Sequence, residues 1–207
     1  MANQISLGHM DTKTYLSSGN PSDHNSPAGF YVVTKDTDDR RIGLRWDICN
    51  SKLIQANAAA KLDWEVVLVS GLLPGHDIQI DGLPFWCRIP LSVQDQDLRS
   101  KSTSWDEPFW EFDERTQRGI PSSESRQLFV RLVLEPRPPA LEVLEGHNAR
   151  LLTPSAILDA KITEAGPYDL ACRVLKWRSG GPDFDWGIFA NKTLYITKEA
   201  VLNAAII

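Results

Sequence analysis

Apolar and polar residues alternate along most of this chain in short runs about ten residues apart, and each run ends near Gly, Pro, Asn or Asp. One run places Leu44, Trp46 and Ile48 on one side of an extended chain and Arg45 and Asp47 on the other. A period of two residues is typical of a strand with one buried and one wetter face. The pattern therefore predicts an all-β fold, an antiparallel β-barrel or β-sandwich of about ten strands with one or two short helices. The predicted strand runs are 30–35, 41–49, 63–69, 76–80, 85–92, 126–135, 140–145, 155–163, 168–177, 184–190 and 193–197.

The domain organisation follows from where this pattern begins and where it is interrupted. Residues 1–28 are dominated by turn-forming and polar residues, so we expect a flexible N-terminal tail. Residues 29–207 are expected to form a single β domain. A stretch at about 94–125 is much longer than a hairpin needs, which predicts a helical or flap insertion there.

The insertion contains the most unusual segment of the chain. Residues 104–115 hold two of the seven Trp, two Phe and five acidic residues. Ser104 and Glu107 have the spacing of a capping box, and Gly119 and Pro121 would end a helix. We expect a short helix or an ordered flap, acting as a lid, a docking patch or a plug in the core. Its inward residues would be Trp105, Phe109 and Phe112, and its outward residues Asp106, Glu111 and Glu114. A second short helix is predicted at residues 198–205.

Composition narrows the range of partners and the compartment. The net charge of the 207 residues is −5 and the basic residues are scattered, which disfavours nucleic acid and anionic membrane surfaces as partners. No apolar run approaches the roughly 20 residues that a bilayer requires, and the N-terminus lacks the features of a secretory signal. Three distant cysteines in strand-like runs are typical of buried, reduced thiols. These features predict a cytoplasmic protein.

Candidate chemistry rests on single residues, because the sequence contains no nucleophile elbow, phosphate-binding loop or dinucleotide fingerprint. The four histidines lack metal-ligand spacing, so we expect no metal ion. The candidate catalytic residues are the strand-borne Arg45, Asp47 and Arg88, together with His76 beside an acid in a Gly-flanked turn. In a barrel such strand charges could point into a lumen, whereas in a sandwich they form the wet outer face.

Seven tryptophans are many for a chain of this size, and they suit a ligand pocket or an interface equally well. The candidate ligand-binding residues are Trp46, Trp64, Trp86, Trp105, Phe109, Trp110, Trp177 and Trp186.

In its general character the chain is similar to small, cofactor-free β-barrel proteins of lipocalin-like type, some of which are cyclases or isomerases of apolar metabolites. The resemblance implies an apolar small molecule in a Trp-lined cavity, either bound or converted by a cyclase or isomerase that needs no cofactor. The alternative is a non-enzymatic β-sandwich that binds a protein or a glycan through exposed aromatic residues. A homodimer is compatible with both hypotheses.

Overall fold

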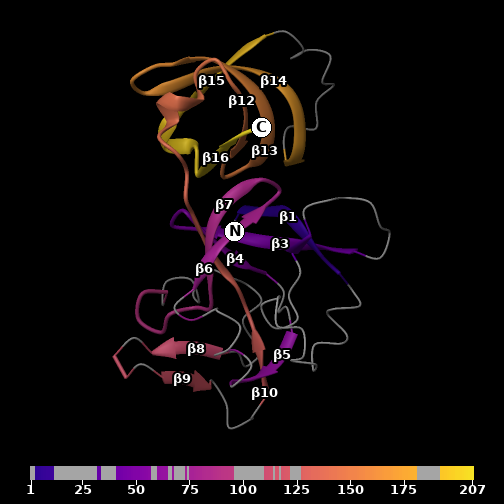
Figure 1. The fold of residues 1–207 in the computed structure, drawn as a ribbon, viewed down its shortest axis with the longest axis vertical. Coiled ribbons are helices and arrows are strands. Elements are labelled where there is room, and N and C mark those ends of the chain that lie inside the picture. Colours follow the sequence, from indigo (N-terminus) through magenta and orange to yellow (C-terminus); the bar gives the residue numbers. More distant parts are fainter. Residues whose placement is uncertain are drawn as a thin grey trace.

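The structure of the protein is a computed structural model that describes residues 3–11, 32–33, 41–56, 60–64, 67, 73, 75–95, 110–113, 115–116, 118–121, 127–180 and 192–207. These residues contain sixteen strands and two 3₁₀-helices, which confirms the all-β fold class (Figure 1). The strands are β1 (Asn3–Asp11), β2 (Val32–Val33), β3 (Arg41–Cys49), β4 (Lys52–Gln55), β5 (Ala60–Asp63), β6 (His76–Ile80), β7 (Leu83–Arg88), β8 (Trp110–Asp113), β9 (Arg118–Pro121), β10 (Gln127–Val130), β11 (Val133–Pro136), β12 (Asn148–Leu152), β13 (Ala156–Ala165), β14 (Asp169–Gly180), β15 (Thr193–Thr197) and β16 (Asn203–Ile206). The 3₁₀-helices are η1 (Leu141–Leu144) and η3 (Lys198–Ala200). No helix in these ranges is long and apolar enough to span a membrane.

Two antiparallel sheets organise the molecule. The seven-stranded sheet has the order β2-β1-β3-β4-β11-β7-β6, and the five-stranded sheet has the order β15-β14-β13-β12-β16. The five-stranded sheet curls strongly, as Figure 1 shows at the top of the view. Two smaller pairs, β5 with β10 and β8 with β9, complete the described strands.

Tight turns fix the register of two hairpins in the seven-stranded sheet. Asn50 and Ser51 between β3 and β4 have φ values of 49° and 62°, and Asp81 and Gly82 between β6 and β7 have 51° and 79°. Two successive residues with positive φ form the type of turn whose twist matches that of paired strands. Asp-Gly is a favoured sequence for this turn. Ser51 adopts a positive φ although serine has no preference for that backbone conformation.

The N-terminal tail predicted for residues 1–28 is wrong for residues 3–11, while residues 12–28 lie outside the described part. β1 lies between β2 and β3, with Ile5 opposite Trp46. Ile5 and Leu7 are buried in the core. The three residues Ile5, Ser6 and Leu7 already alternate, but this signal is too short to stand out from its polar surroundings.

Both helix predictions need correction. Trp110–Asp113 pairs with Arg118–Pro121 as β8 and β9, so only the flap alternative fits there, and residues 104–109 lie outside the described part. Phe112 packs against the core as predicted, but Glu111, expected to face water, is buried. Residues 198–205 form η3 and then β16, because Asn203 to Ile206 pair with β12.

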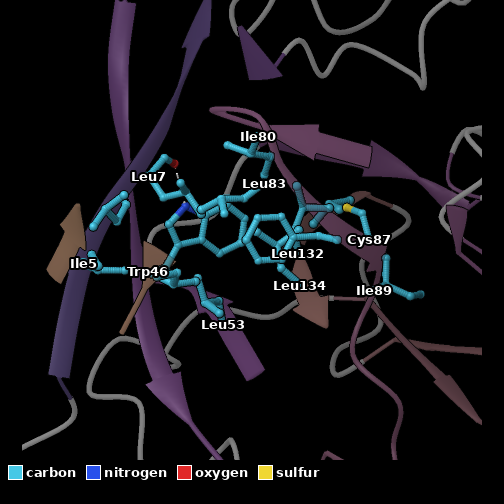
Figure 2. Packing of buried hydrophobic residues seen from close by; sticks show 14 of the residues in the cluster. Ile5, Leu7, Trp46, Leu53, Ile80, Leu83, Cys87, Ile89, Leu132 and Leu134 are labelled. Carbon is cyan, nitrogen blue, oxygen red and sulfur yellow. Dashed lines mark hydrogen bonds between the residues drawn. The ribbon is translucent and has the colours of Figure 1, made fainter. Parts of the chain in front are cut away.

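The main core joins both sheets. Trp46 is fully buried at its centre, with Leu53, Leu83 and Leu134 among its neighbours in the cluster, and its Nε1 donates a hydrogen bond of 2.8 Å to the carbonyl of Leu7 (Figure 2). Leu152 and Ile157 from the five-stranded sheet belong to the same cluster. A second cluster of buried residues fills the five-stranded sheet itself; it consists of Leu144, Ala149, Leu151, Leu158, Ala160, Ile162, Leu170, Cys172, Val201 and Ala204.

Polar contacts also connect the two sheets. The Asn203 side chain in β16 donates to the Pro84 carbonyl in β7 at 2.5 Å, and Arg150 in β12 donates to the carbonyl of Asp81 in the β6–β7 turn. The β6–β7 hairpin therefore covers one end of the five-stranded sheet next to β16.

Candidate functional site

The four candidate catalytic residues occupy three different environments. Asp47 and Arg88 lie on the outer face of the seven-stranded sheet, opposite the face that carries Trp46. Arg45 shares that face but is exposed, whereas His76 is half-buried opposite Cys87 on the core side. The structure therefore brings only Asp47 and Arg88 into one buried row.

That row can be followed residue by residue across four strands. Asp47 pairs with Ile54, Ile54 with Val133, and Val133 with Arg88. Three strand spacings separate the two ends, about 14 Å. Ile54 and Val133 are fully buried between them, so an apolar strip keeps Asp47 and Arg88 apart. At its own end, Asp47 accepts a hydrogen bond of 2.8 Å from the side chain of Gln4.

Arg88 is the centre of a compact ion-pair cluster with Asp95, Glu135 and Lys52. Its Nη1 lies 2.5 Å from Oδ2 of Asp95, and its Nη2 lies 2.5 Å from Oε1 of Glu135 and 3.2 Å from Oδ1 of Asp95. Nε donates to Glu135 at 3.0 Å and Nη1 to the Ile89 carbonyl at 3.0 Å. A guanidinium has five N–H donors, so these five bonds use all of them and leave none for a substrate.

Lys52 and the chain after β7 complete the cluster. Lys52 Nζ lies 2.8 Å from Asp95 and 3.4 Å from Glu135, and the Leu91 amide donates to Asp95 at 2.7 Å. The hairpin β8–β9 holds this chain in place, since Phe112 donates to the Pro90 carbonyl at 3.0 Å and accepts from the Ser92 amide at 2.9 Å. Two cations and two carboxylates balance one another.

The pKa values agree with a cluster of permanent charges. Burial alone would raise the pKa of Asp95 and of Glu135, but hydrogen bonds from Arg88 and Lys52 outweigh it and leave both below their ordinary values. Burial alone would lower the pKa of Arg88, and the two carboxylates raise it instead. A carboxyl that acts as a general acid near pH 7 needs a raised pKa, and an arginine that acts as a general base needs a lowered one. Both shifts are opposite to those of Asp95, Glu135 and Arg88. Burial also raises the pKa of the Cys87 thiol to about 12, against the attraction of Arg88, which makes this cysteine inert.

A second buried cluster lies on the five-stranded sheet. Asp159 accepts from Arg150 Nε at 2.7 Å and from Arg178 Nε at 2.7 Å. Burial alone would raise the pKa of Asp159, but the two arginines lower it. Arg150 also bonds the Asp81 carbonyl, so this cluster fixes the junction of the two sheets. The sequence gives no signal for this cluster, because neither Arg150 nor Asp81 lies in a recognisable motif.

The candidate ligand-binding aromatics are spread over the molecule. Trp46 is in the core, and Trp64 is half-buried against that core, with its ring close to Gly119. Trp86 lies on the outer face, where the Arg137 guanidinium is 5.3 Å from its ring centroid. Trp177 packs against the second cluster. Because Trp46 and Trp86 occupy opposite faces of one sheet, they cannot both line a single cavity. Outside the described part lie Trp105, Phe109, Trp186 and the side chain of Trp110.

Exposed apolar side chains gather instead on the five-stranded sheet. Tyr168, Leu175 and Tyr195 are 83%, 52% and 66% exposed. We define the open face as the exposed outward side chains of β15 and of β14 from Asp169 to Leu175, together with Tyr168 in the adjoining turn. Its members are Tyr168, Arg173, Leu175, Thr193, Tyr195 and Thr197. The exposed Lys176 and Arg178 continue the same side of β14 beyond it. The sequence pattern predicts the strands here, but the only candidate it offers on them is Trp177, which packs against the core cluster, although Thr-Leu-Tyr-Ile-Thr already shows an aromatic residue among outward-facing positions.

Comparison with known proteins leaves the open face as the main guide to function. No protein-family model, no curated protein and no solved structure matches this chain. Within the described ranges, no group of three or more His, Cys, Asp or Glu side chains is placed to hold a metal ion.

Proposed function

We propose that this protein is a non-enzymatic interaction module that binds a polypeptide partner through the open face of its five-stranded sheet. The observation that carries the proposal is the exposure of Tyr168, Leu175 and Tyr195 on one sheet. Exposed apolar patches on a folded domain often mark interaction sites, and tyrosine is enriched where binding energy concentrates. The aliphatic Leu175 and the backbone groups at the sheet edge suit a polypeptide better than a glycan.

The charged residues support the same proposal because they are already engaged within the fold. Arg88 has all of its donors bound, and Asp159 is held by two arginines. Side chains held in this way stabilise the fold and are poor candidates for chemistry on a substrate. Binding of an apolar small molecule, with or without cyclase or isomerase activity, stays a prediction, as does the cytoplasmic location.

A peptide-display experiment tests the proposal with an unbiased set of ligands. Random linear peptides would be selected on the immobilised wild-type protein, and the affinity of the enriched peptides measured for Tyr195→Lys and Tyr168→Lys. We expect each substitution to weaken binding by about tenfold, because truncating an interface anchor typically costs more than 1 kcal/mol. Arg45→Glu is the control, because Arg45 is exposed on the other sheet. Binding that Arg45→Glu abolishes and the tyrosine variants retain would contradict the proposal.

A further inference from the structure

The edge of the five-stranded sheet carries an unusual strand. β15 is the terminal strand of that sheet, and in the described part of the chain β14 is its only partner. Its five residues, Thr193 to Thr197, contain no charge and no proline and are all β-branched, aromatic or leucine. Free edges are normally protected by charges, proline or a covering segment, because their open backbone groups can pair with another chain.

Two other edge strands of the large sheets show such protection. β6 carries the exposed Asp77 and Gln79 and is followed in the turn by Asp81. β16, at the opposite edge of the five-stranded sheet, is held beside β7 by the bond from Asn203 to Pro84. Among the described residues β15 has neither device, so its sequence is suited to pairing.

We propose that β15 pairs antiparallel with β15 of a second copy of this chain, so that two five-stranded sheets join into one of ten strands. This inference rests on the proposed function and names the partner of the same surface. Its basis is that β15 has the same pattern of residue types in both directions: Thr, aliphatic, Tyr, aliphatic, Thr. A two-fold axis at Tyr195 then places every residue opposite one of its own kind, as an isologous interface requires.

The pairs formed in this register are favourable on both faces of the sheet. On the open face Tyr195 meets Tyr195 of the second copy, and Thr193 meets Thr197 of the second copy. Aromatic pairs and Thr–Thr pairs are among the stabilising cross-strand combinations. On the other face Leu194 would meet Ile196 of the second copy, and both already pack against the core cluster of their own sheet. The apolar layer would therefore continue across the junction.

Two lysines meet at each end of the paired strands, and Glu142 reduces their repulsion. The register brings Lys192 of one copy beside Lys198 of the other, but Lys198 Nζ is bonded at 2.5 Å to Glu142. The Glu142 side chain is 67% exposed, so its second oxygen is open to Lys192 of the second copy. One carboxylate thus offsets one of the two lysines at each end and leaves a single positive charge, so these exposed ion pairs limit the repulsion without adding a net attraction.

Cysteine substitutions test the register directly. In Tyr195→Cys the two new Cβ atoms would be about 5 Å apart across the axis, so a small approach of the two edge strands brings them to the roughly 3.5–4.5 Å of a disulfide. In Thr193→Cys the two thiols would be four residues apart along the strands, about 13 Å. Under mild oxidation we expect a covalent dimer from Tyr195→Cys and none from Thr193→Cys. The native Cys49, Cys87 and Cys172 are all buried and serve as the internal background. Equal cross-linking of both variants, or of neither, would overturn the register.

Sedimentation over a range of concentrations tests the association itself. The wild-type chain should form dimers, and Tyr195→Lys, which would place two lysines opposite each other, should raise the dissociation constant by about tenfold or more. Tyr168→Lys makes the same change on a more exposed tyrosine that lies outside β15, so it should leave the dimer unchanged. Amide hydrogen exchange in β15 should slow with concentration in the wild type and in Tyr168→Lys, but not in Tyr195→Lys.

The outcomes separate this inference from the proposed function. A chain that stays monomeric at all concentrations but binds peptides through Tyr168 and Tyr195 would overturn the dimer and leave the interaction module standing. A Tyr195-dependent dimer that binds no selected peptide would support the dimer and contradict a heterologous polypeptide partner.

Discussion

The two large sheets of this protein differ in how far the face away from their own core is buried. In the seven-stranded sheet the central strands are buried on both faces: Trp46 and Phe85 lie on the core side, while Ile54, Val133 and Arg88 are buried on the other. In the five-stranded sheet one face packs around its own core, and the other is buried against the main core at Leu152 but exposes Leu175 and Tyr195 on β14 and β15. A charge on a doubly buried sheet must find a partner within the protein, as Arg88 does, whereas an apolar residue on an open face is free to meet another molecule.

The largest expected effect comes from trimming the two termini, one in each sheet. Deleting residues 1–11 removes the interior strand β1, exposes the surface that Ile5 and Leu7 cover and takes the acceptor from Trp46 Nε1. We expect a loss of at least about 4 kcal/mol in the free energy of unfolding, enough to abolish cooperative folding in a marginal domain. Deleting Ile206 and Ile207, each 50% exposed, should cost about 1 kcal/mol or less. Urea denaturation followed by circular dichroism compares the two, and equal losses would refute the contrast.

Truncating one aromatic residue in each sheet sharpens the comparison. Trp46→Ala should cost about 3–5 kcal/mol, because it leaves a cavity in a filled core and an unpaired carbonyl at Leu7. Tyr168→Ala should change the free energy of unfolding by about 0.5 kcal/mol or less, since that side chain is almost wholly exposed. The midpoints of urea unfolding measure both. A small loss for Trp46→Ala would mean that its ring lines a space instead of filling the core.

The sequence predicts the strands of both sheets better than it predicts their pairing. The runs 41–49, 76–80 and 193–197 coincide with β3, β6 and β15, because alternation and turn residues are local signals. The run 126–135 is divided into β10 and β11, which belong to different sheets. Residues 140–145, read as a strand, contain η1 instead. These differences depend on long-range partners, which no short window of sequence contains.

The candidate site was less predictable than the fold for a related reason. Arg88 stands out on its strand, but Asp95 lies beyond the strand end, and Glu135 becomes a neighbour only when β11 pairs with β7. Alternation correctly placed Arg45, Asp47 and Arg88 away from the core. The alternation pattern does not distinguish the buried Asp47 and Arg88 from the exposed Arg45, because burial on the outer face of this sheet depends on which other segments pack against it.

Removing one partner from the buried cluster tests whether its charges are structural. Arg88→Met should cost about 3 kcal/mol, because Asp95 would remain buried with only Lys52 to offset two carboxylates. The matched control Arg45→Met removes an exposed arginine from the same face of the same sheet and should change stability by about 0.5 kcal/mol or less. Chemical denaturation at neutral pH measures the difference. Similar small losses for both variants would show that the ion pairs of Arg88 contribute little.

The smallest expected effect is the pH dependence of unfolding, which compares Asp95 beneath the seven-stranded sheet with Asp159 on the five-stranded one. The pKa of each carboxyl is lowered in the folded protein, so the unfolded chain binds protons first as the pH falls. Their contribution to stability is therefore complete above the ordinary pKa of about 4 and is lost progressively as the pH falls through the folded values. Asp95→Asn and Asp159→Asn should each flatten the fall in urea midpoint between about pH 5 and pH 2.

The exposed Asp77→Asn serves as the control and should keep the wild-type slope. We expect the greater flattening for Asp95, because its side chain is 1% exposed and that of Asp159 is 8%, which leaves less screening by water around Asp95. A wild-type slope in both variants would mean that carboxyls elsewhere in the chain govern acid unfolding.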